Sequence, residues 1–188
     1  MSPRAGLDQT AVIESAALLV DEEGIEQLSL GRLAERLGIK KPSLYNHVAG
    51  LPGLKRNLAV YCLREVLARF SRAAIGKSGA DAIIAFADAY RSYAREHPGR
   101  YALTLQAPDP TDQELVEIST QTVDVARALL APYKLEEEET IHAIRSLRSI
   151  VHGFVSLEAA GGFGMPINLD ASFHWLLTTF TSTLERIS

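Results

Sequence analysis

The sequence predicts an all-α protein with about nine helices, in which an N-terminal three-helix helix-turn-helix domain precedes a larger helical body. Hydrophobic residues recur at intervals of three and four over most of the 188 residues, and no segment keeps the two-residue alternation typical of a strand. Glycine and proline separate the periodic segments. Hydrophobic residues make up 47% and charged residues 22% of the chain, which is typical of a globular protein.

The first fifty residues predict three helices. Asp8 can accept a hydrogen bond at the start of a first, longer helix, and Ser29 can cap a second, short one. Gly38 can supply the positive φ of a sharp turn. Pro42 suits the first turn of a third helix that runs to about Val48. Two short helices across a glycine turn, braced by a longer helix, form a helix-turn-helix.

Six further helices are expected after the Gly-Leu-Pro-Gly stretch that begins at residue 50. Their expected ranges are 54–74, 80–96, 98–106, 112–130, 136–160 and 171–187. We therefore divide the chain into a helix-turn-helix domain at residues 1–52 and a helical domain at residues 53–188.

The cysteine content and the length of the apolar segments indicate in which cellular compartment the protein is expected. The single cysteine, Cys62, can form neither an intrachain disulfide nor a CxxC site. Apolar runs such as residues 13–20 are shorter than the roughly 20 residues that span a bilayer. Residues 1–8 lack the apolar core of a secretory signal. We therefore expect a cytoplasmic protein without a membrane partner.

The charge distribution indicates one small surface suited to phosphates. The net charge of −4 does not by itself suggest a nucleic-acid partner. Between residues 28 and 56, however, a single acid, Glu35, stands against six bases: Arg32, Arg36, Lys40, Lys41, Lys55 and Arg56. A basic patch on an acidic chain is typical of a protein that touches phosphates locally, although solvated helix faces show the same pattern.

The stretch most informative about function is LAERLGIKKPSLYNHV at residues 33–48. Its Leu-Ala-x-x-Leu-Gly-Ile turn, followed by Leu-Tyr-x-His-Val, resembles the tetracycline-repressor (TetR) family of one-component regulators. The resemblance is strongest over residues 12–54. It implies a ligand-responsive repressor that binds a pseudo-palindromic operator in double-stranded DNA as a homodimer.

A recognition helix in the major groove needs hydrogen-bond donors along one exposed face. Asn46 could read adenine, and the two lysines before Pro42 could meet guanine or phosphate. In the family's pattern Tyr45 and His47 contact backbone phosphate; the alternative is that they pack or cap within the small domain. The predicted DNA-binding residues are Arg32, Lys40, Lys41, Pro42, Ser43, Tyr45, Asn46, His47 and Lys55.

Two positions depart from the family's pattern. Lys40 stands where Ser or Thr usually caps the third helix, and Leu51 stands where a lysine usually grips a phosphate. Lys55, one turn further on, or the N–H groups at the start of the next helix could replace that lysine. The sequence therefore does not decide which group contacts the phosphate that this lysine usually binds.

In this family the helical body binds the effector and forms the dimer. Residues 148–158 resemble a subgroup named for a Trp-His-Gly signature, here with Val151 in place of the tryptophan. His152 is either a core residue or a ligand contact, and aromatic side chains could line an apolar pocket or pack as plain core. The predicted ligand-binding residues are Tyr61, Phe86, Tyr90, Tyr93, Tyr101, His152 and Phe154.

The last two expected helices carry more apolar surface than a monomer needs. This surplus predicts a four-helix bundle across a two-fold axis, and the small residues at 159–162 would permit close helix approach. The predicted dimer-interface residues are Ile150, Phe154, Leu157, Phe173, Leu176, Leu177, Phe180 and Leu184.

Two rival functions compete with a ligand-responsive regulator. For an enzyme, Glu138 and His142 have the i, i+4 spacing of metal ligands, but they lie in a charged helix start. Because no phosphate loop or nucleophile elbow accompanies them, we expect no catalytic activity, cofactor or metal. The second rival is a DNA-bound interaction protein that recruits a partner and has no small-molecule effector. An open pocket would favour the regulator, and a sealed apolar core the interaction protein.

Overall fold

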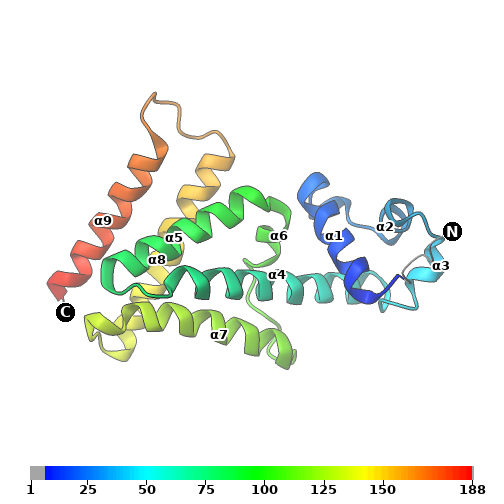
Figure 1. The fold of residues 1–188 in the computed structure, drawn as a ribbon, viewed down its shortest axis with the longest axis horizontal. Coiled ribbons are helices and arrows are strands. Elements are labelled where there is room, and N and C mark those ends of the chain that lie inside the picture. The colour runs from blue at the N-terminus through cyan, green and yellow to red at the C-terminus, as the bar shows by residue number, and fades with distance from the viewer. Residues whose placement is uncertain (1–6, 188) are drawn as a thin grey trace. The chain divides into compact units, whose positions relative to one another are not determined.

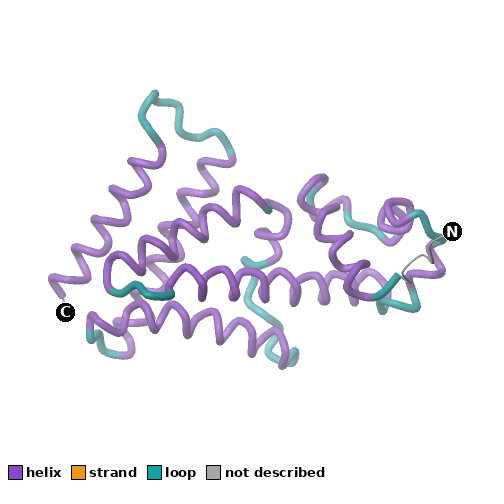
Figure 2. Tube along the Cα trace, in the orientation of Figure 1, coloured by secondary structure: helices purple, strands orange, loops and turns teal. Residues whose placement is uncertain are grey.

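The computed structural model describes residues 7–187, which form nine α-helices, two short 3-10 helices and no strand (Figures 1 and 2). The predicted all-α class is confirmed. No helix among these residues is long and apolar enough to cross a bilayer. The α-helices are α1 (Gln9–Glu23), α2 (Leu30–Leu37), α3 (Lys41–Leu44), α4 (Gly50–Ala74), α5 (Gly79–Glu96), α6 (Pro98–Leu103), α7 (Gln113–Leu130), α8 (Glu137–Ala159) and α9 (Leu169–Ile187).

The chain divides into two compact units. Unit 1 comprises Met1–Arg64 and His97–Leu115, and unit 2 comprises Glu65–Glu96 and Val116–Ser188. This division differs from the predicted boundary at residues 52 and 53. Helix α4 begins in unit 1 and ends in unit 2, and the segment around α6 packs with the N-terminal helices.

The caps of the N-terminal helices follow from single residues. Asp8 accepts a hydrogen bond from the Ala11 N–H at 2.8 Å, and the Ser29 hydroxyl accepts one from the Arg32 N–H at 3.3 Å. Gly38, with φ 66°, adopts the left-handed conformation that ends α2. These three predictions are confirmed. Apolar residues of α1, α2, α3 and the turn after α3 belong to the buried core of unit 1: Val12, Ala16, Val20, Leu33, Leu44 and Val48.

Two predicted helix boundaries are wrong. The third helix ends at Leu44, and the backbone continues to Val48 as a series of turns. Helix α4 begins at Gly50, three residues after His47, so the Gly-Leu-Pro-Gly stretch starts a helix instead of preceding one. The physical reason is that Pro52 lies in the first turn of α4, where an N–H group has no helical acceptor.

Helices α5, α8 and α9 pack together in unit 2. Phe70 from the end of α4 lies against Phe86 and Tyr90 of α5, with ring centroids 4.5 and 5.3 Å away. The ring centroid of Phe173 of α9 lies 4.9 Å from that of Phe154 of α8, and both rings lie close to Arg91 of α5. These aromatic contacts form two separate parts of the core.

Candidate nucleic-acid interface

The recognition segment, defined as residues 40–47, has an exposed polar face in unit 1. Leu44 has no exposed surface and anchors the segment in the core, whereas 58% of Tyr45 is exposed. The Tyr45 ring and hydroxyl are therefore accessible to a partner molecule. The structure exposes the predicted DNA-binding residues Arg32, Lys40, Lys41, Pro42, Ser43, Tyr45, Asn46 and Lys55, and half-buries His47.

Local backbone geometry positions this segment. The Gly38 N–H donates to the Glu35 carbonyl and the Ile39 N–H to the Ala34 carbonyl, each at 3.0 Å, which turns the chain sharply after α2. Lys40 is the N-cap residue of α3 and makes no side-chain cap, because an ammonium group can donate but cannot accept a hydrogen bond. Leu51 packs against the apolar core of unit 1, which explains why it cannot replace a phosphate-gripping lysine.

Half of the basic residues between 28 and 56 are paired with acids of their own unit. In the described part of the chain, the lysines of this region form no ion pair, and all three arginines do. The unpaired positive charge of the candidate interface is therefore carried by lysines. The arginine pairs are Arg32 with Glu23 at 3.0 Å, Arg36 with Glu22 at 2.8 Å and Arg56 with Asp112 at 2.6 Å.

Asp21, near the end of α1, holds the start of α6. Its carboxylate accepts a hydrogen bond from the Arg100 backbone N–H at 2.9 Å and lies 3.1 Å from His97 Nδ1. The Arg100 guanidinium Nε is 2.9 Å from the same carboxylate. At Gly99 the backbones come so close that an added Cβ would lie 1.9 Å from the Val20 carbonyl oxygen. These contacts explain why α6 belongs to unit 1.

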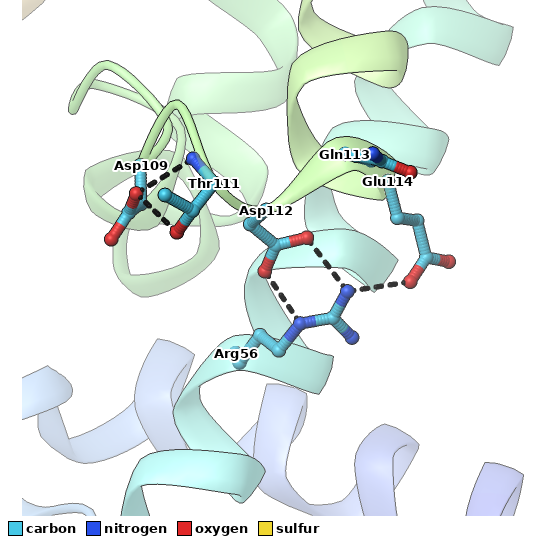
Figure 3. A pocket seen from close by; sticks show the side chains of 6 residues that line it. All are labelled: Arg56, Asp109, Thr111, Asp112, Gln113 and Glu114. Carbon is cyan, nitrogen blue, oxygen red and sulfur yellow. Dashed lines mark hydrogen bonds and ion pairs between the residues drawn. The ribbon is translucent and has the colours of Figure 1, made fainter.

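A second charged cluster joins α4 to the start of α7 (Figure 3). Arg56 donates from Nε to Asp112 at 2.6 Å, and from Nη2 to Asp112 and Glu114, each at 2.8 Å. Arg64 donates to the other oxygen of Glu114 at 2.8 Å. These hydrogen bonds raise the pKa of the Arg56 guanidinium and lower the pKa of the Asp112 carboxyl. The cluster borders an open hollow of about 540 Å³, lined by Arg56, Asp109, Thr111, Asp112, Gln113 and Glu114.

The predicted ligand-binding residues do not form one lining. Tyr61 and Tyr101 belong to unit 1, and the other five belong to unit 2. Within unit 2, Tyr93 is 2% exposed and donates to Glu65 at 3.3 Å, and His152 is half-buried. Phe86 and Tyr90 pack around Phe70, and Phe154 packs between two other phenylalanines, 4.8 and 4.9 Å away. A second hollow of about 500 Å³, in unit 2, is lined by Asp88, Arg91, Ser92, Arg95 and Glu96 and holds none of the predicted set.

The predicted dimer-interface residues need correction. Four of them are buried inside unit 2 and have almost no surface left for a partner: Phe154, Phe173, Leu177 and Leu184. Three are half-buried, namely Ile150, Leu176 and Phe180, and 51% of Leu157 is exposed. The prediction missed Trp175, the chain's sole tryptophan, although 71% of it is exposed on α9. A helical wheel of α9 could have separated it from the buried stripe.

Sequence reasoning also missed a buried ion-pair cluster in unit 2. Arg91 of α5 donates to both carboxylate oxygens of Glu158 on α8, at 2.6 and 2.9 Å, and to Asp170 on α9 at 2.8 Å. Its guanidinium also lies 5.1 and 4.9 Å from the ring centres of Phe154 and Phe173. Only 7% of the Arg91 side chain is exposed. The partners are far apart in sequence, so no local pattern indicates this cluster.

The pair considered for metal binding lies on the surface. Glu138 and His142 are 3.6 Å apart, and 90% and 65% of their side chains are exposed. Among the described residues, no group of three or more His, Cys, Asp or Glu side chains could hold a metal ion.

Comparison with known proteins agrees with this architecture. A family model described as the C-terminal domain of tetracyclin repressor-like proteins matches residues 83–180. The HTH-type transcriptional regulator Rv0681 of Mycobacterium tuberculosis is 34% identical over 97% of this chain and 84% of its own length. The HTH-type transcriptional regulator YobS of Bacillus subtilis is 35% identical over 98% of this chain and 96% of its own.

A solved structure extends the similarity to tetracycline repressors. It is a TetR variant from Acinetobacter baumannii in complex with minocycline. The two chains superpose with a TM-score of 0.70 at 25% identity, over 96% of this chain and 98% of that one.

Proposed function

This chain belongs to the TetR family of transcriptional regulators, and from that premise we propose that it is a ligand-responsive repressor that binds a pseudo-palindromic operator as a homodimer. The observation that carries the DNA-binding part is the recognition segment, whose polar face is exposed while Leu44 anchors it in the core. Its relatives from Mycobacterium tuberculosis and Bacillus subtilis, both HTH-type regulators, support the same part. Because a repressor acts where the chromosome lies, we place the protein in the cytoplasm.

In this proposal the recognition segment enters the major groove. Lys41, Ser43 and Asn46 offer donors to base edges, and Tyr45 and His47 offer theirs to the DNA backbone. Lys55, exposed in the second turn of α4, takes the place of the lysine that is usual at position 51.

Selection of bound sequences from a random duplex library tests this proposal. We expect an inverted repeat whose half-sites are centred roughly 34–36 Å apart, the spacing of one helical turn. Lys41→Ala should weaken binding to the selected duplex, and Lys134→Ala, which removes an exposed lysine of unit 2, should not. Selected sequences without an inverted repeat would contradict a two-fold-symmetric complex.

For the homodimer we propose an interface on the exposed faces of α8 and α9. Leu157 and Trp175 are exposed there, and an added Cβ at Gly153 would meet nothing within 4 Å. A second copy would cover these apolar side chains, and a mostly apolar contact is what obligate homodimers use. Leu176 and Phe180, half-buried in the single chain, would complete the contact.

Sedimentation measurements test this interface. Trp175→Glu would place a charge in the apolar contact and should shift the protein toward monomers. The matched control is Ile75→Glu, because Ile75 is an exposed apolar residue, at 73%, that lies outside α8 and α9. A Trp175→Glu protein that sediments as the wild-type dimer would overturn the interface.

One observation favours a second candidate function, a DNA-bound protein that recruits a partner and has no effector. The predicted pocket aromatics of unit 2 pack against other core residues. Solvent extraction of the purified protein, mass spectrometry of the extract and anisotropy on the selected duplex distinguish the two functions. A co-purified compound that releases the duplex supports the ligand-responsive repressor. Duplex binding that no extracted compound changes supports the recruiting protein.

A further inference from the structure

Arg56 belongs to two groups of residues at once. In sequence it ends the basic region that carries the candidate DNA contacts, directly after Lys55. In space its guanidinium is occupied by two carboxylates from the start of α7 (Figure 3). Its third nitrogen, Nη1, lies 3.5 Å from the Asn57 side-chain oxygen. Every nitrogen of this guanidinium therefore has a partner within unit 1.

The carboxylate oxygens accept hydrogen bonds from Arg56 in the arrangement that phosphate oxygens would use. Asp112 accepts two parallel hydrogen bonds from the guanidinium, which is also the way a phosphodiester is bound by arginine. The contact is not sealed, because 41% of the Arg56 side chain is exposed. The Glu114 side chain is exposed to the same extent, and ion pairs between such exposed side chains are weak. A DNA strand that approaches Lys55 therefore meets a neighbouring arginine that can change partners.

We propose that Asp112 and Glu114 hold Arg56 in an autoinhibitory contact, and that Arg56 exchanges them for a DNA phosphate when the protein binds DNA. The inference rests on the proposed function and adds a regulatory element to its DNA-binding surface. After the exchange each of the two carboxylates still has a hydrogen-bond partner. Glu114 retains Arg64, and Asp112 still accepts the Leu115 N–H at 3.3 Å as the cap of α7.

The contact gives α7 a means to influence DNA affinity. Helix α7 begins in unit 1 at the acids that hold Arg56 and continues along the chain into unit 2. Because two linked equilibria affect each other reciprocally, whatever fastens residues 109–114 to Arg56 weakens DNA binding. Whatever loosens this segment strengthens DNA binding. Asp112 and Glu114 thus compete with DNA phosphate for Arg56. They compete more effectively when the first turn of α7 is well ordered.

Salt titrations of DNA affinity test the contact without knowledge of the operator. The probe is a fluorescein-labelled 30-base-pair duplex of mixed sequence, followed by anisotropy on the full-length protein. The Asp112→Asn, Glu114→Gln double variant should bind about fivefold more tightly at 0.15 M salt, the size of one exposed ion pair. Its slope of log K against log salt should be steeper by about 0.9, the increment for one more phosphate. Asparagine can still cap α7, so we expect the variant to fold.

Two comparisons separate this contact from a general charge effect. The matched control neutralises Glu96 and Glu137, which pair with Arg69 and Arg127 in unit 2, and should leave the slope unchanged. In an Arg56→Gln background the Asp112→Asn, Glu114→Gln change should also leave the slope unchanged.

The inference is overturned if the double variant has the wild-type slope and affinity, or if its gain persists without Arg56. Those results leave the proposed function standing, because the wild-type protein still binds the duplex. A wild-type protein that binds no duplex at any salt concentration would overturn the proposed function and this inference with it.

Discussion

The two units each contain one arginine held by two carboxylates, but they use this cluster differently. In unit 1, 41% of the Arg56 side chain is exposed, and the cluster borders an open hollow. In unit 2, 7% of the Arg91 side chain is exposed, and two phenylalanine rings lie close to its guanidinium. The two arginines differ in exposure: an ion pair made by an exposed arginine contributes little to stability, whereas a buried arginine depends on its carboxylate partners. Burial, more than the residue types, separates a surface contact from a core contact.

The largest effect should come from breaking the buried cluster. Arg91→Met removes the cation that is hydrogen-bonded to Glu158, whose side chain is 14% exposed, and leaves this carboxylate without its ion-pair partner. We expect the free energy of unfolding to fall by about 3 kcal/mol in urea denaturation. Arg56→Met, the same substitution in the exposed cluster, should change it little. Equal losses for the two variants would show that burial is not what distinguishes the clusters.

A backbone contact of unit 1 should give the next largest effect. Gly99→Ala would place a methyl group 1.9 Å from the Val20 carbonyl oxygen, so α6 must move away from α1. We expect a loss of about 2 kcal/mol in the free energy of unfolding, typical of overpacking. Gly31→Ala in α2 is the control, since its methyl group would lie 3.9 Å from Ser29 Oγ, an ordinary contact, and the substitution favours a helix by up to about 1 kcal/mol. A Gly99→Ala protein as stable as the wild type would mean that α6 is not held by this close approach.

A pH series sharpens the comparison further. Hydrogen bonds from Arg91 lower the pKa of the Glu158 carboxyl below its ordinary value of 4.5. Because the folded pKa is the lower one, the contribution of Glu158 to stability is complete above the unfolded pKa. It is lost as the pH falls through the folded pKa.

Urea denaturation between pH 3 and 7 checks this expectation. The stability difference between the wild type and Glu158→Gln should be constant above about pH 5 and should shrink below pH 4.5. A difference that grows toward low pH would contradict the sign of the pKa change.

The smallest effect on stability should come from the recognition segment, where exposure is greatest. Tyr45→Phe removes one hydroxyl from a side chain that is 58% exposed. We expect an unchanged urea midpoint and a DNA affinity reduced by about fivefold, the value of one hydrogen bond of roughly 1 kcal/mol. Val48→Ala, which truncates a buried neighbour, should lower the urea midpoint. A Tyr45→Phe protein with a lower midpoint would place this residue in the core.

What could be predicted from the sequence depends on how local each interaction is. The caps at Asp8 and Ser29 and the turn at Gly38 involve residues within five positions of one another, so propensity and spacing identified them. The start of α4 was misplaced because Pro52 is compatible both with a break and with a first helical turn. Only the packed structure distinguishes these two possibilities.

The long-range contacts could not be predicted. Arg91 and Glu158 are separated by 67 positions, and nothing near either residue indicates the other. On α9 the apolar stripe of Phe173, Leu177 and Leu184 was predicted to lie in a dimer interface, but these side chains are buried within the single chain. Periodicity shows that a helix has an apolar face; it does not show whether that face meets the same chain or a second copy.

The discontinuous make-up of unit 1 has a consequence for synthesis on the ribosome. The helix-turn-helix leaves the ribosome first. The contacts of Asp21 can form only after His97 and Arg100 have been synthesised, and those of Arg56 only after Asp112. At about 5–20 residues per second, the 51 positions between Arg64 and Leu115 take roughly 3–10 s to translate. During that interval the first part of unit 1 has apolar surface that residues 97–115 will cover later. Nascent chains stalled before and after residue 115 should therefore differ in their susceptibility to proteolysis within α1 and α2.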